Sequence, residues 1–320
     1  MAACERACPT IREGVHYLTL NGIWHNIAMN RKIFLILSYM RAIAYIFLLT
    51  LLAAPPAFSQ NSGSSGAAPQ QQQQQPSSSA ATTAADEKAE QVLKRALEAM
   101  GGSAYMSVRS VVGQGLFTPY RDGQSTTPVK FVDYIVYPDR ERTEFRGQGL
   151  KIIQTNTGDK GWVYDGEAKT LKDATPQQVA DFRLSLRASF DNLLRGAWRK
   201  EGARLSYIGR REAGLGQRNE AVRLVYPDDL TIEFEVGARD ARPAKIISKR
   251  KDAKGEEVLE EDHLAQHVMV NGILAPFIID HYRNGVQSSR TNYESIEFNR
   301  AVADDLFVRP ASAKDVKWQK

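Results

Sequence analysis

The sequence has 320 residues, of which 42% are hydrophobic and 25% charged, and its formal net charge is +5. The first 59 residues hold five of the 42 Lys and Arg and two of the 37 Asp and Glu, which leaves 37 basic against 35 acidic residues in the rest of the chain. This near balance excludes the strongly basic surface that nucleic-acid binding requires, so we expect no nucleic-acid partner.

Residues 40–59 have the pattern of a secretory signal peptide. Arg41 precedes a short apolar run, and small residues before Ser59 predict cleavage after that residue. The apolar run is shorter than the roughly 20 residues of a membrane-spanning helix. We therefore predict a periplasmic protein. An inner-membrane anchor through residues 42–58 is the alternative.

Residues 1–39 resemble no targeting segment, and we interpret them as a mis-assigned start or an extended basic region of the signal. Met29 and Met40 are the alternative starts. Cys4 and Cys8 are the two cysteines of the sequence, and both precede the predicted cleavage point. The secreted form is therefore expected to contain no disulfide and no thiolate site.

The first predicted helix follows a polar segment. Residues 60–85 are rich in Gln, Ser and Ala and contain almost no large apolar residue, which predicts a disordered linker. Residues 86–100 place apolar side chains at steps of three and four, with Asp86 as the predicted cap and Gly101 as the end. Because the other side of this helix is charged, we expect the helix to lie on an apolar surface.

Most of the remaining chain predicts strands. Leu230 to Val236 alternates apolar and polar residues, which is the period of a strand with one buried face. Asn271-Gly272 and Asn284-Gly285 stand between apolar runs and predict hairpins. Gly113 and Gly115 predict a bulge or a bend. The charged run 139–146 predicts an exposed strand.

A second helix interrupts the strands over residues 176–195. Thr175 is the predicted cap, Pro176 takes the first helical position and Gln178 the third. The apolar stripe behind them is suited to covering a hollow. We predict a mainly β, α+β fold: a single curved antiparallel sheet, or open half-barrel, of about ten or eleven strands with two helices over the concave face. This domain covers residues 86–310, and residues 311–320 form a polar tail.

The sequence contains few candidates for catalytic or metal-binding residues. His263 and His267 stand four apart near two acids, but on a strand this spacing separates them by about 13 Å, too far to share one ion unaided. The sequence contains no nucleophile elbow and no phosphate-binding glycine loop. We expect no metal, no cofactor and no enzymatic activity.

Aromatic and aliphatic side chains are the remaining candidates for a site. They either fill a core or line a cavity for a hydrophobic ligand. The residues selected as the candidate ligand site are Phe131, Tyr134, Trp162, Tyr164, Phe182, Leu186, Phe190, Ile232 and Phe234.

Several stretches carry a resemblance to a known family. They are Ala99-Met100-Gly101-Gly102, Asp240 to Ile246 with the later Gly255, Val270 to Pro276, and Phe307-Val308-Arg309-Pro310. With these stretches the chain resembles the periplasmic outer-membrane lipoprotein-sorting proteins, the LolA-like superfamily. The resemblance implies a half-barrel, lidded by helices, that holds lipid chains in an apolar cavity.

The expected function follows from both lines of reasoning. We expect a monomeric periplasmic carrier or binding protein for lipoprotein acyl chains or other lipid, working with inner- and outer-membrane envelope proteins. The alternative is an envelope-stress sensor or protein-interaction module on the same fold, because the resemblance extends to such proteins.

Overall fold

The computed structural model describes residues 78–147, 149–251 and 255–319. All of them belong to one compact unit. The predicted signal peptide, the residues 1–39 before it and residues 60–77 of the predicted linker lie outside the described residues. Within the described ranges, no helix is long and apolar enough to cross a membrane.

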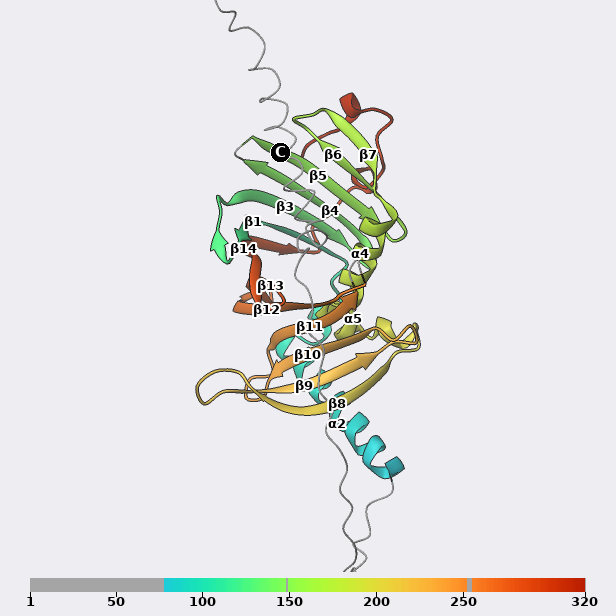
Figure 1. The fold of residues 1–320 in the computed structure, drawn as a ribbon, viewed down its shortest axis with the longest axis vertical. Helices are drawn as coiled ribbons and strands as arrows, with labels where there is room; N and C mark the ends of the chain where they lie inside the picture. Colours follow the sequence, from blue (N-terminus) through green and yellow to red (C-terminus); the bar gives the residue numbers. More distant parts are fainter. Residues whose placement is uncertain (1–77, 148, 252–254, 320) are drawn as a thin grey trace, which may run out of the picture. The chain divides into compact units, whose positions relative to one another are not determined.

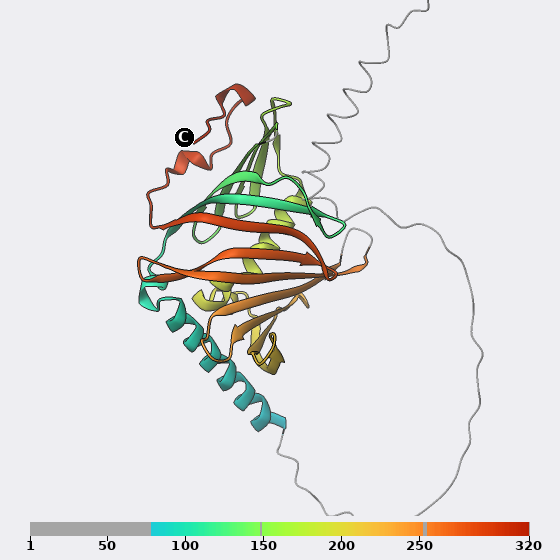
Figure 2. The same ribbon diagram turned by 90° about the vertical axis from the view of Figure 1, so that its left-hand side faces the viewer.

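The unit is built on one antiparallel sheet of 14 strands, in the order β7-β6-β5-β4-β3-β1-β14-β13-β12-β11-β10-β9-β8, with β2 paired to β1 (Figures 1 and 2). One half comprises β1 (Ser110–Arg121), β2 (Gln124–Ser125), β3 (Val129–Val136), β4 (Arg140–Gly147), β5 (Leu150–Thr157), β6 (Lys160–Asp165) and β7 (Thr170–Asp173). The other comprises β8 (Arg204–Glu212), β9 (Arg218–Val225), β10 (Thr231–Gly237), β11 (Pro243–Lys251), β12 (Glu257–Val270), β13 (Ile273–Arg283) and β14 (Val286–Phe298).

The sheet confirms the predicted mainly β class with an open, antiparallel arrangement. The strand number exceeds the prediction because short strands such as β2 and β7 carry too few residues to show a periodicity. The two predicted Asn-Gly hairpins connect β12 to β13 and β13 to β14. Asn271 and Asn284 have the positive φ angles, 50° and 49°, that such turns need.

The helices differ from the prediction at two points. α2 spans Ser78–Met100, so it starts eight residues before Asp86, and residues 78–85 of the predicted linker are helical. The predicted helix 176–195 is two helices, α4 (Pro176–Arg187) and α5 (Phe190–Arg195). The break occurs because Ala188 leaves the helical conformation and the Ser189 side chain caps α5 by accepting a hydrogen bond from the Asn192 N–H.

The short elements are α3 (Ser103–Met106) and three 3₁₀ turns, η1 (Ala197–Arg199), η2 (Asp304–Leu306) and η3 (Ala313–Asp315). The segment containing α4, α5 and η1 connects β7 with β8, which are the two ends of the strand order, and it runs along the sheet from one end toward the other (Figure 1). The predicted capping box at Thr175 is present, with both of its hydrogen bonds.

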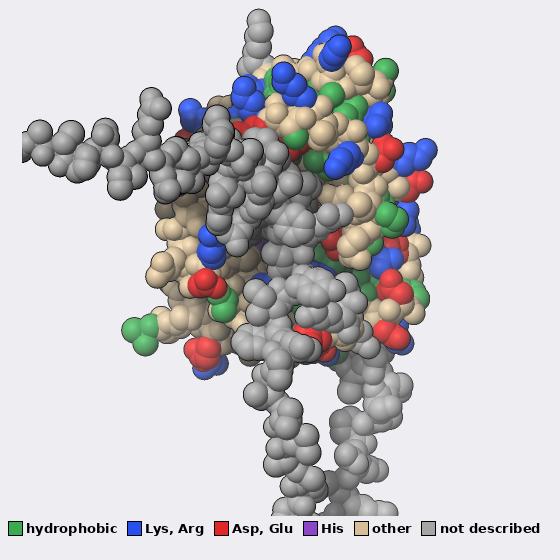
Figure 3. Space-filling view, turned by 45° about the horizontal axis from the view of Figure 1, so that its top comes forward, with side chains coloured by type: hydrophobic (Ala, Val, Ile, Leu, Met, Phe, Trp, Pro, Cys, Tyr) green, Lys and Arg blue, Asp and Glu red, His purple; other side chains and the backbone are tan. Residues whose placement is uncertain are grey.

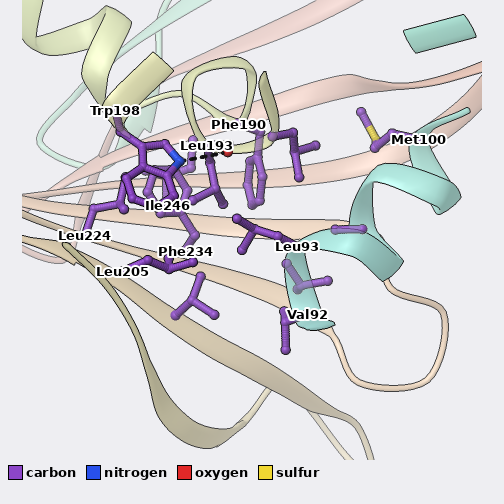
Figure 4. Packing of buried hydrophobic residues seen from close by; sticks show 14 of the residues in the cluster. Val92, Leu93, Met100, Phe190, Leu193, Trp198, Leu205, Leu224, Phe234 and Ile246 are labelled. Carbon is purple, nitrogen blue, oxygen red and sulfur yellow. Dashed lines mark hydrogen bonds between the residues drawn. The ribbon is translucent and has the colours of Figure 1, made fainter. Parts of the chain in front are cut away.

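One face of the sheet, which we call the helix face, packs against α2, α5 and η1. Its core contains Phe234, fully buried, whose ring meets Phe190 of α5 edge-on at 5.3 Å (Figure 4). Val92 and Leu93 of α2 and Trp198 of η1 complete the cluster over strands β8 to β11. The helix face is therefore filled by protein side chains over this half of the sheet.

The opposite face, the tail face, carries residues 302–319, which we call the C-terminal segment. Leu306 and Phe307 pack against Tyr134 and Val112, and Trp318 packs beside Trp162 and Tyr164. Within residues 311–320, which the sequence predicts as a polar tail, the apolar side chains of Ala313, Val316 and Trp318 pack against this face of the sheet.

Candidate ligand-binding site

The nine residues predicted to bind a ligand lie on both faces of the sheet. Tyr134, Trp162 and Tyr164 belong to the tail face, where the C-terminal segment covers them. The Trp162 Nε1–H donates a hydrogen bond of 3.1 Å to the Phe307 carbonyl. These three aromatic residues therefore anchor the chain's own C-terminal segment.

Three other predicted residues fill the core of the helix face. Phe190, Ile232 and Phe234 are buried in the cluster formed with α2 and η1 (Figure 4). A substitution at any of them tests the stability of the fold as much as the binding of a ligand.

Three predicted residues are left as candidates, one on the helix face and two on α4. Phe131 of β3 and Phe182 of α4 are buried, yet neither belongs to any of the three clusters of buried hydrophobic side chains formed by the described residues. Leu186 of α4 is half-buried. The sequence grouped these residues in one site. In the structure, none of them belongs to a cluster of the packed core.

Phe131 is part of an aromatic group that sequence reasoning missed. Its ring meets the Tyr293 ring at 5.3 Å, edge-on. Phe145 lies opposite Phe131 in the β3–β4 register, and its ring meets Phe117 of β1 at 5.5 Å. Strand register places all four rings on the helix face. We call Phe117, Phe131, Phe145 and Tyr293 the aromatic group.

Two acidic side chains stand on the same face beside the aromatic group. The Thr143 hydroxyl lies 2.9 Å from Asp133 Oδ1, to which it donates, and 3.4 Å from Glu141 Oε1. Burial, together with the negative charge of Glu141, raises the pKa of Asp133 well above its ordinary value. Burial also raises the pKa of Glu141. The protein environment thus makes both carboxyl groups harder to ionise than in water.

The Tyr293 hydroxyl shares this environment. Burial, followed by the charges of Asp133 and Glu141, raises the pKa of Tyr293 far above its ordinary value. The aromatic group therefore adjoins three polar groups whose burial disfavours the charged form. Such a surface combines apolar rings with hydrogen-bonding groups, which suits an apolar chain that ends in a polar group.

α5 is held to the sheet by polar contacts as well as by Phe190. The Tyr105 hydroxyl donates a 2.7 Å hydrogen bond to Asp191, and Asp191 also pairs with Arg195 at 3.1 Å. The Arg195 guanidinium lies over the rings of Tyr105 and Tyr137, at 5.0 and 4.2 Å. These contacts fix α5 on the sheet, and Arg187 ties the end of α4 to Glu201 and Asp228.

The histidines do not gather into a site. His281 contacts Asp262 at 2.6 Å on the helix face, whereas His263 contacts Glu261 at 3.0 Å on the tail face. Burial by itself lowers the pKa of His281, but the Asp262 carboxylate outweighs it and the net shift is upward. Burial lowers the pKa of His267.

Charged side chains of both signs mix on the surface seen in Figure 3, in keeping with the balanced composition. Over the described ranges, no group of three or more His, Cys, Asp or Glu residues is arranged to hold a metal ion.

No protein-family model matches the chain, and no curated protein matches it. Among solved structures, similarity is found to a LolA superfamily protein, NE2245, from Nitrosomonas europaea, with 12% identity, a TM-score of 0.47, and coverage of 69% of this chain and 97% of that one. A DUF1329 family protein from Desulfovibrio piger gives 12% identity, a TM-score of 0.49 and the same two coverages.

A third similarity is to Pseudomonas aeruginosa MucB in its complex with MucA, at 16% identity and a TM-score of 0.23, over 70% of this chain and 62% of that one. The LolA-like resemblance found in the sequence is thus matched by a structure of that superfamily. At these identities the similarity concerns the fold alone.

Proposed function

We propose that this chain is a non-catalytic binding protein of the periplasm that holds the acyl chain of a lipoprotein or another lipid on the helix face of its sheet. The acyl chain would lie over β1, β3, β4 and β14, along the aromatic group, and α4 would cover it. Carriage between the inner and outer membranes is the corresponding role.

The observation that carries the proposal is the difference between the two halves of the helix face. Over β8 to β11, the side chains pack against α2, α5 and η1. Over β1, β3 and β4, the aromatic rings meet one another, and Phe131 lies outside every core cluster of the described residues. Apolar side chains that face a concavity without belonging to the core are typical of a ligand-lined surface.

The energetics are sufficient for useful affinity. Each methylene group of an acyl chain that leaves water gains about 0.8 kcal/mol, so an acyl chain partly enclosed by the aromatic group binds measurably. The carboxyl groups of Asp133 and Glu141, whose pKa values are raised by burial, would supply polar partners for the ester or amide at the end of that chain.

The test is native mass spectrometry and lipid extraction of the protein purified from the periplasm. We expect bound lipid in the wild type and its loss in Phe131→Asp, because a charge amid the aromatic group opposes the apolar chain. Val286→Asp is the matched control: it puts the same charge at a side chain that is 52% exposed, and it should retain the lipid. Circular dichroism verifies that both variants keep the sheet.

Two results would contradict the proposal: a wild type free of lipid, or equal lipid in the wild type and in Phe131→Asp. Phe182→Asp tests the cover in the same way and should weaken retention. If the wild type carries no lipid but co-purifies with an envelope protein, the alternative interaction module replaces the lipid carrier as the better hypothesis.

A further inference from the structure

A hollow lies on the tail face, opposite the face that carries the aromatic group. It has a volume of about 210 Å³ and is lined by residues of β1, β3, β4, β14 and the end of the C-terminal segment. Its apolar floor includes Val112, Val132 and Tyr134, and its polar wall includes Lys130, Arg146, Arg300, Glu144, Glu297 and Gln319. We call it the tail-face pocket.

Basic side chains face one another at this pocket. Lys130 of β3 stands directly opposite Arg146 of β4, and Arg146 stands opposite Lys151 of β5, all three on the tail face. Like charges in directly opposed positions destabilise a sheet. Such a row is therefore suited to an anion that lies between the charges.

The carboxylates nearby do not neutralise this charge. Glu144 is shared between Arg142 and Arg146, at 2.8 and 2.7 Å, and Glu297 pairs with Arg300 at 3.1 Å. Lys130 forms no ion pair with any residue in the described part of the chain. The three basic side chains of the lining, Lys130, Arg146 and Arg300, thus exceed its two acidic ones.

Arg146 also has an unused donor. Its Nη2 donates to Glu144 and to the Gln319 carbonyl, at 2.7 and 2.6 Å, and its guanidinium lies 4.6 Å from the Trp318 ring. Its Nε is buried and has no hydrogen-bond partner. A buried N–H without a partner is uncommon in folded proteins and indicates a missing acceptor. A guanidinium supplies its donors in the geometry that carboxylate and phosphate oxygens accept.

We propose that the tail-face pocket binds a small organic anion, with its carboxylate or phosphate group between Lys130, Arg146 and Arg300 and its apolar part against Val112, Val132 and Tyr134. The side chains of the two proposed sites lie on opposite faces of the sheet, and Phe131 of β3 is the residue that borders both. Binding would also tie the C-terminal segment to the sheet, since Gln319 lines the pocket.

The experiment uses the full chain and three probes at constant ionic strength in chloride: inorganic phosphate, phenyl phosphate and benzoate. Calorimetric titration and the thermal midpoint report binding, since a ligand of the folded state raises the midpoint. We expect phenyl phosphate or benzoate to bind more tightly than inorganic phosphate, because the apolar part contributes. The tighter of the two identifies the anionic group.

Lys130→Gln should weaken binding of that probe about tenfold, as loss of a charge-assisted contact does. It should not lower the thermal midpoint without the probe, because the repulsion with Arg146 is removed. Lys151→Gln is the matched control: it removes a charge from the same row outside the pocket lining and should bind nearly as well as the wild type.

Absence of binding by all three probes would overturn the proposal, and so would equal weakening by Lys130→Gln and Lys151→Gln, which would indicate diffuse attraction. Phe145→Asp changes the aromatic group outside the pocket lining and should leave anion binding unchanged. Failure of the anion site can therefore be distinguished from failure of the lipid site.

Discussion

The ring of Tyr293 lies against the backbone of Gly113, where a side chain has no room. A Cβ atom added at Gly113 would stand 2.5 Å from Tyr293 Cε1. At Gly115 it would stand 2.0 Å from the Asn292 carbonyl oxygen. The two glycines therefore allow Tyr293 to lie flat on the helix face and to meet Phe131 edge-on.

We predict that Gly115→Ala destabilises the protein more than Gly113→Ala. The obstacle at Gly115 is backbone, which cannot turn away, whereas the ring at Gly113 can shift. Overpacking of this kind costs about 1–3 kcal/mol of unfolding free energy, with Gly115→Ala at the upper end. Urea unfolding measures both, with Gln114→Ala as an exposed control on the same strand. Equal stability of Gly115→Ala and the wild type would contradict the close contact.

The pKa of Asp133 predicts how stability depends on pH. A carboxyl group whose folded-state pKa is raised contributes stability fully below its unfolded pKa, about 3.9, and loses that contribution as pH rises through the folded pKa. Asp133→Asn cannot ionise and still accepts the Thr143 hydrogen bond. We therefore expect the variant to match the wild type near pH 4 and to become the more stable of the two as pH rises.

The measurement for Asp133→Asn is urea unfolding from pH 4 to pH 8 at constant ionic strength. Asp159→Asn, at an exposed turn, controls for the loss of one negative charge. A stability difference that does not grow with pH, or that favours the wild type at pH 8, would show that Asp133 is not held in a raised-pKa environment.

Much of the sheet could be predicted because strand periodicity and turn chemistry are local properties. Leu230 to Val236 predicted β10, and the Asn-Gly pairs predicted two hairpins. Gly113 and Gly115 predicted an irregularity, which falls between Gln114 and Gly115. The register shows that the extra residue is Glu294, on the neighbouring strand β14, and the partner strand could not be known from Gly115 alone.

The sites were harder to predict. Alternation with a period of two assigns the side chains of a strand to the two faces of the sheet, but it does not show which segment covers each face. Trp162 and Phe131 have the same aromatic character, yet the C-terminal segment, distant in sequence, covers only Trp162. The prediction of an exposed strand over residues 139–146 was wrong at Arg142 and Glu144, which are 3% and 1% exposed. Charged side chains are normally exposed to solvent. Arg142 and Glu144 are buried because they pair with each other beneath the C-terminal segment.

The different packing of α4 and α5 against the core gives a prediction on stability. Phe190→Ala empties the centre of the core over Phe234 and should cost about 3–5 kcal/mol of unfolding free energy. Phe182→Ala, on α4 and outside the core clusters, should cost less and raise the rate of hydrogen exchange within α4 while leaving that of α5 unchanged. Equal losses in the two variants would mean that α4 is as firmly packed as α5.

The ion pair between Arg142 and Glu144 should hold the C-terminal segment on the sheet. Arg142 donates to Glu144 and to the carbonyls of Leu306 and Lys317, at 3.0 and 2.7 Å, so Arg142→Met leaves a buried carboxylate and two carbonyls with fewer donors. Breaking a buried pair from one side costs about 3–5 kcal/mol, and we expect this loss in urea unfolding. Faster trypsin cleavage after Lys317 should accompany it.

Arg140→Met is the control on the same strand: its pair with Asp304 is exposed and contributes less than about 1 kcal/mol. If Arg142→Met unfolds at the same urea concentration as the wild type, or if Lys317 stays protected, the C-terminal segment is held by Phe307 and Trp318 alone.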